Sequence, residues 1–227
     1  MSSTQTMFVD LQRLHSCGES GSLIIRLMMA SNDISLANQC LSKFKEEQPP
    51  IRKHVQRGAC MYFIRLQCGH LNEAMKIIQE IRDDQNLYDR VERCSRMAQD
   101  SFNKLANCLK GNSDNDRFEQ YVGQIRQNTV FHYSKKLVDR ALSDRSARQE
   151  ARQSKITRGD HISLWRFELA DDIVDSMVCR QIWKIPRNAD LRQKADLNAD
   201  YGSDLCQAFL NFCGEFIFRY IKEHAVI

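Results

Sequence analysis

Arg126 and His132, with five residues between them, are the one pair of side chains in this sequence that we single out for chemistry. A histidine gains and loses a proton near neutral pH, so it can act as a general acid or a general base. An arginine presents a planar set of donors that can stabilise a developing negative charge. The pair could therefore combine proton transfer with charge stabilisation, provided that the fold brings the two side chains together.

The start of a helix decides whether these two side chains can meet. In an unbroken helix, six positions correspond to a rotation of about 240°, which would place Arg126 and His132 on different faces. We predict instead a helix that begins near Thr129 and runs to Leu142, with Asn128 as its N-cap. Arg126 then belongs to the segment that enters the helix and can fold back towards His132. On spacing alone, a surface arginine and a surface histidine that never meet are the simpler interpretation.

Basic residues dominate the sequence that follows. His132 falls on the polar, positively charged face of the predicted helix, together with Lys135, Lys136, Asp139 and Arg140. Between residues 135 and 158 there are eight basic and three acidic side chains, which gives a local net charge of +5. That charge could attract phosphate, although a solvated helix face that runs into a loop would carry the same pattern.

Apolar residues recur at spacings of three and four along most of the chain, and this pattern predicts helices. With only 3 Pro and 9 Gly, the composition also favours helix. We find no alternating strand pattern, so the predicted fold is all-α. We expect residues 1–21 to be a loosely ordered N-terminal segment, with a short helix near residues 8–14, and residues 22–227 to form one domain. The helices are expected at residues 22–45, 51–67, 72–83, 87–109, 117–125, 129–142, 164–183 and 204–222, with a turn at Cys68-Gly69-His70.

The composition argues against several classes of protein. The nine cysteines are odd in number and form no CxxC pair, so the spacing of a metal site is missing. Most of them fall at apolar positions of predicted helices, where a free thiol acts as a small hydrophobe, which indicates a reducing, cytoplasmic setting. No run approaches the roughly 18 apolar residues of a membrane span, and the net charge of +4 is mild. We therefore expect a soluble protein that uses no membrane, metal or cofactor.

A second group of charged residues lies on the helix predicted at residues 164–183. Asp171, Asp172 and Asp175 form an acidic patch there. Carboxylates so placed could bind a metal ion, but a solvated helix face is the better interpretation. No phosphate-binding loop, glycine-rich dinucleotide turn or Ser/His/Asp order can be recognised. The pair at Arg126 and His132 therefore remains the leading candidate.

The string Arg-Gln-Asn-Thr-Val-Phe-His-Tyr at residues 126–133 resembles the RX4–6H signature of the HEPN superfamily. The likeness includes an isoleucine before the arginine and an aromatic residue before the histidine. HEPN domains are all-α, are built around an up-and-down helical bundle and are usually dimeric. Many are metal-independent endoribonucleases of toxin, phage-defence and CRISPR-associated systems, and others are inactive or bind partners only. The sequence departs in one place, because many members have Asn directly after the arginine and this chain has Gln127, followed by Asn128.

The resemblance implies an HEPN-type bundle with additional N- and C-terminal helices, and cleavage of RNA by attack of the 2′-OH. His132 would be the acid or base, and Arg126 would stabilise the phosphate. Two copies in a homodimer would form one composite cleft, and the resemblance also allows for a neutralising or regulatory protein partner. The remaining substrate-binding candidates are Gln127, Asn128, Tyr133, Lys135, Lys136 and Arg140. The alternative is a non-catalytic α-helical protein that dimerises or binds a partner.

Overall fold

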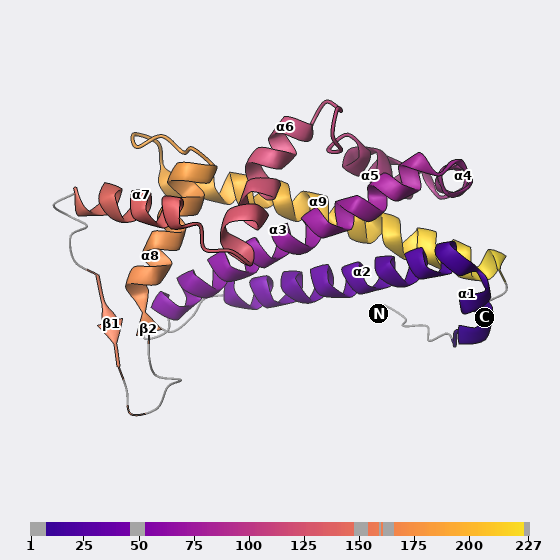
Figure 1. Cartoon of the computed structure of the whole chain (residues 1–227), viewed down its shortest axis with the longest axis horizontal. Helices are drawn as coiled ribbons and strands as arrows, with labels where there is room; N and C mark the ends of the chain where they lie inside the picture. Colours follow the sequence, from indigo (N-terminus) through magenta and orange to yellow (C-terminus); the bar gives the residue numbers. More distant parts are fainter. Residues whose placement is uncertain (1–7, 46–52, 148–153, 159, 161–165, 225–227) are drawn as a thin grey trace. The chain divides into compact units, whose positions relative to one another are not determined.

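The computed structural model describes residues 8–45, 53–147, 154–158, 160 and 166–224. Within these ranges the chain is all-α, as the sequence predicts (Figure 1). None of the described helices combines the length and the apolar content that crossing a bilayer requires. The first seven residues of the predicted loose segment lie outside the described part.

Nine α-helices and three π-helical segments appear in the described ranges. The α-helices are α1 (Leu11–Ser16), α2 (Gly18–Lys45), α3 (Lys53–Asp83), α4 (Gln85–Glu92), α5 (Arg96–Ala106), α6 (Asn115–Phe118), α7 (Lys135–Ser146), α8 (Glu168–Ser176) and α9 (Leu191–Glu223). The π-helical segments are η2 (Glu119–Gly123), η3 (Arg126–Val130) and η6 (Met177–Ile182). A π-helix has a wider turn than an α-helix and is rare in proteins.

The chain divides into two compact units, each built from separated stretches. The first unit holds Met1–Ser35, Glu73–Asn115 and Leu205–Ile227, and the second holds Leu36–Asn72 and Asp116–Asp204. Helices α2, α3 and α9 each contribute residues to both units. The two units are described separately below.

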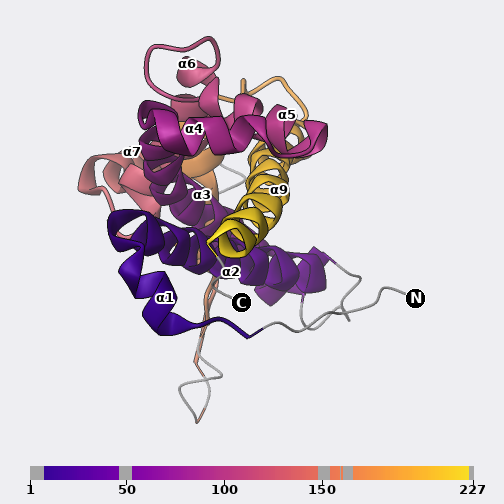
Figure 2. The same ribbon diagram turned by 90° about the vertical axis from the view of Figure 1, so that its right-hand side faces the viewer.

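Aromatic packing between α5 and α9 forms the core of the first unit. The ring centroids of Phe102 and Phe212 lie 5.0 Å apart, and those of Phe212 and Phe216 lie 5.1 Å apart. All three rings are fully buried. Figure 2 shows α5 alongside this part of α9 and α1 folded back beneath the first turns of α2. The apolar spacing predicted at residues 204–222 is therefore the buried face of α9, although α9 itself begins at Leu191.

A close backbone contact fixes α1 against α2. A Cβ added at Gly21 would lie only 2.2 Å from the carbonyl oxygen of Leu14. We expect Gly21→Ala to lower the free energy of unfolding by about 1–3 kcal/mol, because two backbones would have to move apart. Urea unfolding followed by circular dichroism measures this change.

Gly214 in α9 is the matched control for that substitution. An added Cβ there meets no atom within 4 Å. Gly214→Ala should therefore stabilise the protein by up to about 1 kcal/mol, the helix propensity difference between the two residues. Similar effects of the two substitutions would contradict a specific contact at Gly21.

The helix boundaries of the first unit differ from the prediction where a capping residue interrupts the apolar pattern. The helix expected at residues 87–109 is two helices, α4 and α5. Ser95 separates them, because its hydroxyl accepts a hydrogen bond from the amide of Ala98 and so caps α5. The helix expected from residue 22 begins earlier, at Gly18, and α1 precedes it.

In the second unit, the turn predicted at Cys68-Gly69-His70 is wrong. The helix α3 runs without a break from Lys53 to Asp83. Gly69 serves a different purpose, since a Cβ there would lie 3.0 Å from Cγ1 of Val130. The glycine allows η3, which carries Arg126, to approach α3 closely.

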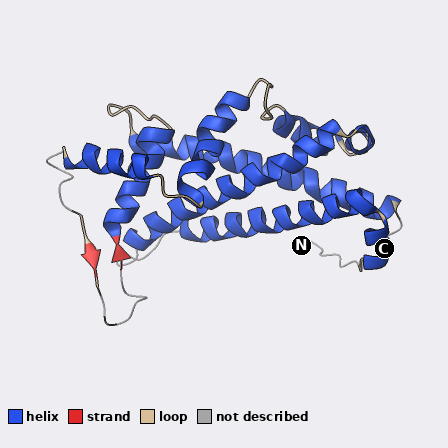
Figure 3. Cartoon of the chain, in the orientation of Figure 1, coloured by secondary structure: helices blue, strands red, loops and turns tan. Residues whose placement is uncertain are grey.

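A short strand pair also belongs to the second unit. The strands β1 (Ile156–Thr157) and β2 (Arg166–Phe167) pair antiparallel, with Ile156 opposite Phe167 (Figure 3). β1 lies in the basic segment after α7, and β2 occupies residues of the helix expected at 164–183, which begins only at Glu168 as α8. The strand pair does not change the fold class.

Candidate functional site

The helix predicted to begin at Thr129 with Asn128 as its N-cap does not form. Residues 115–130 make one continuous helical run through α6, η2 and η3, and α7 begins only at Lys135. The side-chain amide of Asn128 donates to the carbonyl oxygen of Gln124 at 2.8 Å, inside that run. Burial explains the longer helix, because Ile125 and Thr129 lie in the core and keep the chain helical through η3.

The break in the helix falls between Arg126 and His132, although at a later position than predicted. Arg126 is the first residue of η3 and is half-buried. His132 lies in the non-helical link of residues 131–134 and is exposed. The rotation of a continuous helix therefore does not separate the two side chains. Their convergence on one substrate stays a prediction.

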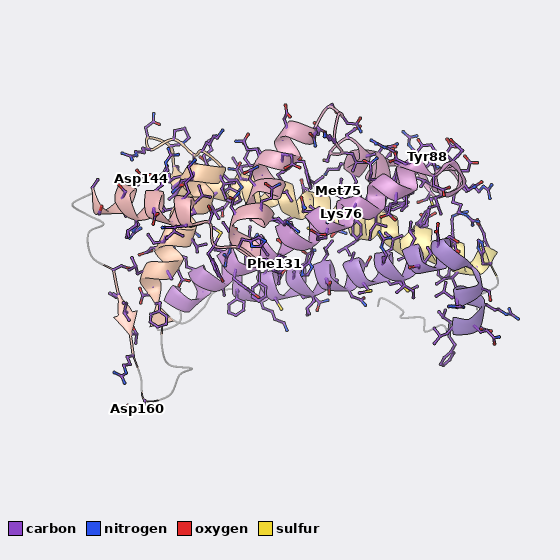
Figure 4. All side chains as sticks on the ribbon, viewed as in Figure 1. Met75, Lys76, Tyr88, Phe131, Asp144 and Asp160 are labelled. Carbon is purple, nitrogen blue, oxygen red and sulfur yellow. The ribbon has the colours of Figure 1, made fainter. Side chains whose placement is uncertain are left out.

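Two exposed aromatic side chains flank His132 in this link. Phe131 is 61% exposed and Tyr133 is 76% exposed. Figure 4 labels Phe131 in the loop that follows η3. Two exposed rings on either side of one histidine form a local apolar surface, and flat rings are the surfaces on which unpaired nucleobases stack.

Arg65 on α3 is a site residue that the sequence did not indicate. Its Nη1 donates to the carbonyl oxygen of Thr129 at 2.6 Å, and its guanidinium carbon lies 6.0 Å from the ring centroid of Tyr62. Burial lowers the pKa of Arg65, and the nearby Tyr133 and Tyr62 act in the opposite direction. Among the described residues, no carboxylate lies within ion-pair distance of Arg65, and the more distant charges of Asp171 and Asp175 also act to raise its pKa.

Arg65 and Gly69 are four residues apart on α3, so they face the same way. Both contact the end of η3, through Thr129 and Val130. No sequence pattern identifies this arrangement, because it depends on which helix packs beside which. Together the two contacts fix the position from which the link starts.

The other predicted substrate-binding residues lie on the surface around the link. Gln127 is exposed on η3. The exposed basic side chains of α7 are Lys135, Lys136 and Arg140. None of the three forms an ion pair with a described residue. Arg145 is different, because it is largely buried and pairs with Asp172. Arg148 and Arg152 of the basic run lie outside the described residues.

Two carboxylates of the acidic patch on α8, which the sequence predicts to be a solvated face, are instead largely buried in ion pairs. The side chains of Asp172 and Asp175 are only 17% and 20% exposed. Asp172 accepts hydrogen bonds from Arg57 at 2.8 Å and from Arg145 at 3.0 Å. Asp175 accepts from Nε of Arg57 at 2.5 Å. These carboxylates hold α8 to α3 and α7, and no cluster of metal-ligating side chains occurs in the part of the chain that the structure describes.

A cavity of about 360 Å³ opens beside η3 in the second unit. Asn128, one of the predicted site residues, lies in its wall. All three π-helical segments contribute to that wall, through Glu119 and Gln120 of η2, Asn128 of η3, and Gln181 and Ile182 of η6. The other lining residues are Gln124, Leu137 and Lys184.

Most of the cysteines lie in the interior of the protein. All nine are free, and six of them are buried. Burial raises the pKa of the Cys68 and Cys179 thiols to about 12 and that of Cys94 to about 11. A thiol that stays protonated is a poor nucleophile and a poor metal ligand. The six buried cysteines therefore act as small apolar side chains, as the sequence predicts.

No protein-family model, curated protein or solved structure matches this chain.

Proposed function

We propose that this protein is an HEPN-like, metal-independent endoribonuclease with His132 and Arg126 as its catalytic residues. The observation that carries the proposal is the setting of His132. It is exposed in a non-helical link, between exposed Phe131 and Tyr133, and the link starts beside the Arg65 cation. Aromatic rings stack on the nucleobases of a single RNA strand, and cations bind its phosphates. A histidine between such groups can act as a general acid or general base on the bound strand.

The proposed reaction needs only groups that the chain and its substrate supply. The 2′-oxygen of a ribose attacks the adjacent phosphorus, and the bond from phosphorus to the 5′-oxygen breaks. A His132 imidazole takes the proton from the 2′-OH, and an imidazolium returns a proton to the leaving 5′-oxygen. Arg126 stabilises the negative charge that builds up on the phosphate oxygens. The products are a 2′,3′-cyclic phosphate and a 5′-OH end.

The remaining predicted residues have supporting roles in this proposal. Tyr133 stacks on a nucleobase, and Gln127 or Asn128 orients the phosphate. The exposed lysine and arginine side chains of α7 neutralise neighbouring phosphates of the strand. A homodimer would supply one histidine as base and a second as acid across the two-fold axis. We place the protein in the cytoplasm, in a toxin or phage-defence role.

Cleavage of a single-stranded RNA in EDTA tests this function. The wild-type protein should cut the RNA and leave 2′,3′-cyclic phosphate and 5′-OH ends, which mass spectrometry identifies. The same RNA with 2′-O-methyl groups should remain intact, because the nucleophile is blocked.

Failure of the folded protein to cut any of several RNAs would overturn the nuclease proposal. That result would favour the alternative, a non-catalytic helical protein that dimerises or binds a partner. The exposed rings of Phe131, Tyr133 and Tyr62 would then form the contact surface.

A further inference from the structure

The cavity of the second unit has features that the proposed cleavage does not use. Three π-helical segments meet in its wall, although such segments make up well under 1% of residues in globular proteins. A π-helical turn is less stable than an α-helical one and occurs frequently at functional sites. The volume of about 360 Å³ lies within the range of small-molecule pockets.

Two opposite charges line the cavity without neutralising each other. Glu119 and Lys184 form no ion pair with one another or with any other described residue. The Glu119 carboxylate lies along its own helix, where a Cβ at Gly123 would come within 2.3 Å of it. Because Gly123 has no side chain, the Glu119 carboxylate can occupy this space. One acceptor group and one cation are thus available to a ligand.

Lys184 is held at the cavity by a strained backbone. Its φ of 54° lies in the left-handed region, which residues other than glycine rarely adopt. The amide of Ile185 donates to the carbonyl oxygen of Cys179 at 2.9 Å and so closes the end of η6 around this residue. A glycine would satisfy the backbone better, so a lysine here suggests a use for its side chain.

The side-chain amides in the wall offer both donors and acceptors. Nδ2 of Asn128 donates to the main-chain oxygen and to Oε1 of Gln124, while Nε2 of Gln124 and Oδ1 of Asn128 form no hydrogen bond with another described residue. Nε2 of Gln181 donates to the carbonyl oxygen of Leu137, while its buried Oε1 has no hydrogen-bond donor among the described residues. The wall therefore suits a ligand that carries both hydrogen-bond donors and acceptors on its edges.

We propose that this cavity binds a guanine base, either in a free nucleotide or in RNA. Guanine is the base that presents two adjacent donors, N1–H and the 2-amino group, to which a carboxylate such as Glu119 can bind with both oxygens. Its O6 and N7 are acceptors for a lysine such as Lys184. Adenine, cytosine and uracil each place an acceptor where the carboxylate would need a donor. Leu137 and Ile182 supply apolar contact for the faces of the ring.

This inference goes beyond the proposed nuclease and holds whether or not the protein cleaves RNA. Isothermal titration calorimetry with GMP, AMP, CMP and UMP tests it on the full chain. GMP should bind at one site per chain, and the other three should bind roughly tenfold more weakly or worse. Inosine monophosphate, which lacks the 2-amino group, should also bind more weakly than GMP. Measurable binding of all four nucleotides with equal affinity would overturn the proposal.

Two substitutions locate the site, and a third controls for charge. Glu119→Gln should weaken guanine binding by about tenfold or more, because an amide replaces one acceptor with a donor. Lys184→Gly removes the cation at a position whose backbone suits glycine, so the fold is retained while binding weakens. Glu92→Gln, on an exposed residue of the first unit, should change nothing. Unchanged binding in both cavity variants would overturn the assignment.

A second arm separates the two sources of guanine. Short 2′-O-methyl oligonucleotides with one guanine, or with adenine in its place, are titrated in the same way, and they remain intact if the protein is a nuclease. Guanine-dependent binding of the oligonucleotide alone identifies RNA as the source, and binding of GMP identifies a free nucleotide. Absence of guanine-dependent binding in both arms would overturn the proposal and leave the nuclease proposal to its own test.

Discussion

His132→Ala is expected to lower the rate of RNA cleavage in EDTA by about 10²–10⁴-fold, the usual contribution of a general acid or base. His132 is exposed in the link of residues 131–134, so its removal should leave the free energy of unfolding almost unchanged. Initial rates on a fluorescent RNA measure the first quantity, and urea unfolding measures the second. A loss of rate without a loss of stability separates a chemical role from a structural one.

The matched control for this prediction is His15→Ala. His15 is also exposed and lies on α1 in the first unit. The His15→Ala variant should cleave RNA at the wild-type rate. If His132→Ala and His15→Ala were equally active, the RX4–6H likeness would be accidental and His132 would have no catalytic role.

Arg126 requires a different variant, because it is half-buried and its loss could disturb η3. Arg126→Lys keeps the positive charge and most of the side-chain volume. Lysine is a point charge that cannot reproduce the planar pair of donors, so we expect a loss of cleavage similar to that of Arg126→Ala. Full activity of the lysine variant would limit Arg126 to a general electrostatic role.

The second large effect is expected at Asp172. Its carboxylate accepts hydrogen bonds from two guanidinium groups, those of Arg57 and Arg145, and from Ser154. Asp172→Asn should lower the free energy of unfolding by about 2–3 kcal/mol, because two partly buried cations lose their shared partner. Urea unfolding at pH 7 measures the change.

Asp175 is the matched control, because it lies on the same helix but binds only Arg57. Burial raises the pKa of Asp175, and the charge of Arg57 acts in the opposite direction. A carboxyl whose pKa is raised by folding contributes stability below its unfolded pKa of about 3.9, and loses that contribution as the pH rises through its folded pKa. The ionised form is therefore a net cost at pH 7.

Asp175→Asn should accordingly leave stability at pH 7 within about 1 kcal/mol of the wild type, or raise it. The free energy of unfolding of the variant relative to the wild type should increase as the pH rises from about 3.9. It should level off above the folded pKa of Asp175. If Asp175→Asn lowered the free energy of unfolding as much as Asp172→Asn does, Asp175 would contribute equally to the ion-pair network.

Much of the fold was predictable where one apolar stripe faces a core. Ile34, Leu41 and Phe212 belong to patterns of three- and four-residue spacing that α2 and α9 bury. The polar first half of α9 lacks this stripe, so its start at Leu191 was missed. The break at Ser95 was missed for the opposite reason, because the apolar spacing continues across it while Ser95 caps the start of a new helix, α5.

The candidate site was predictable only in part, because its geometry depends on contacts between helices. Arg126 and His132 stand out by residue type and by their resemblance to a known signature. Arg65 does not, since its significance comes from packing beside Thr129. Gly69 carried a misleading signal, because a glycine that permits a close helix contact and a glycine that ends a helix look the same in sequence. The π-helical turns have no sequence signal that we can identify.

The division of both units among separated stretches has a consequence for how the chain can acquire its structure. The first unit needs Met1–Ser35 together with Leu205–Ile227, so its aromatic core between α5 and α9 can close only after nearly all of the chain described here has emerged from a ribosome. A chain that stops before residue 205 keeps the edge contact of Phe102 with Tyr88 but lacks the Phe212 ring. Such a chain exposes apolar surface that proteases and chaperones recognise. Incomplete copies of this protein would therefore be removed rather than accumulate as partly folded molecules.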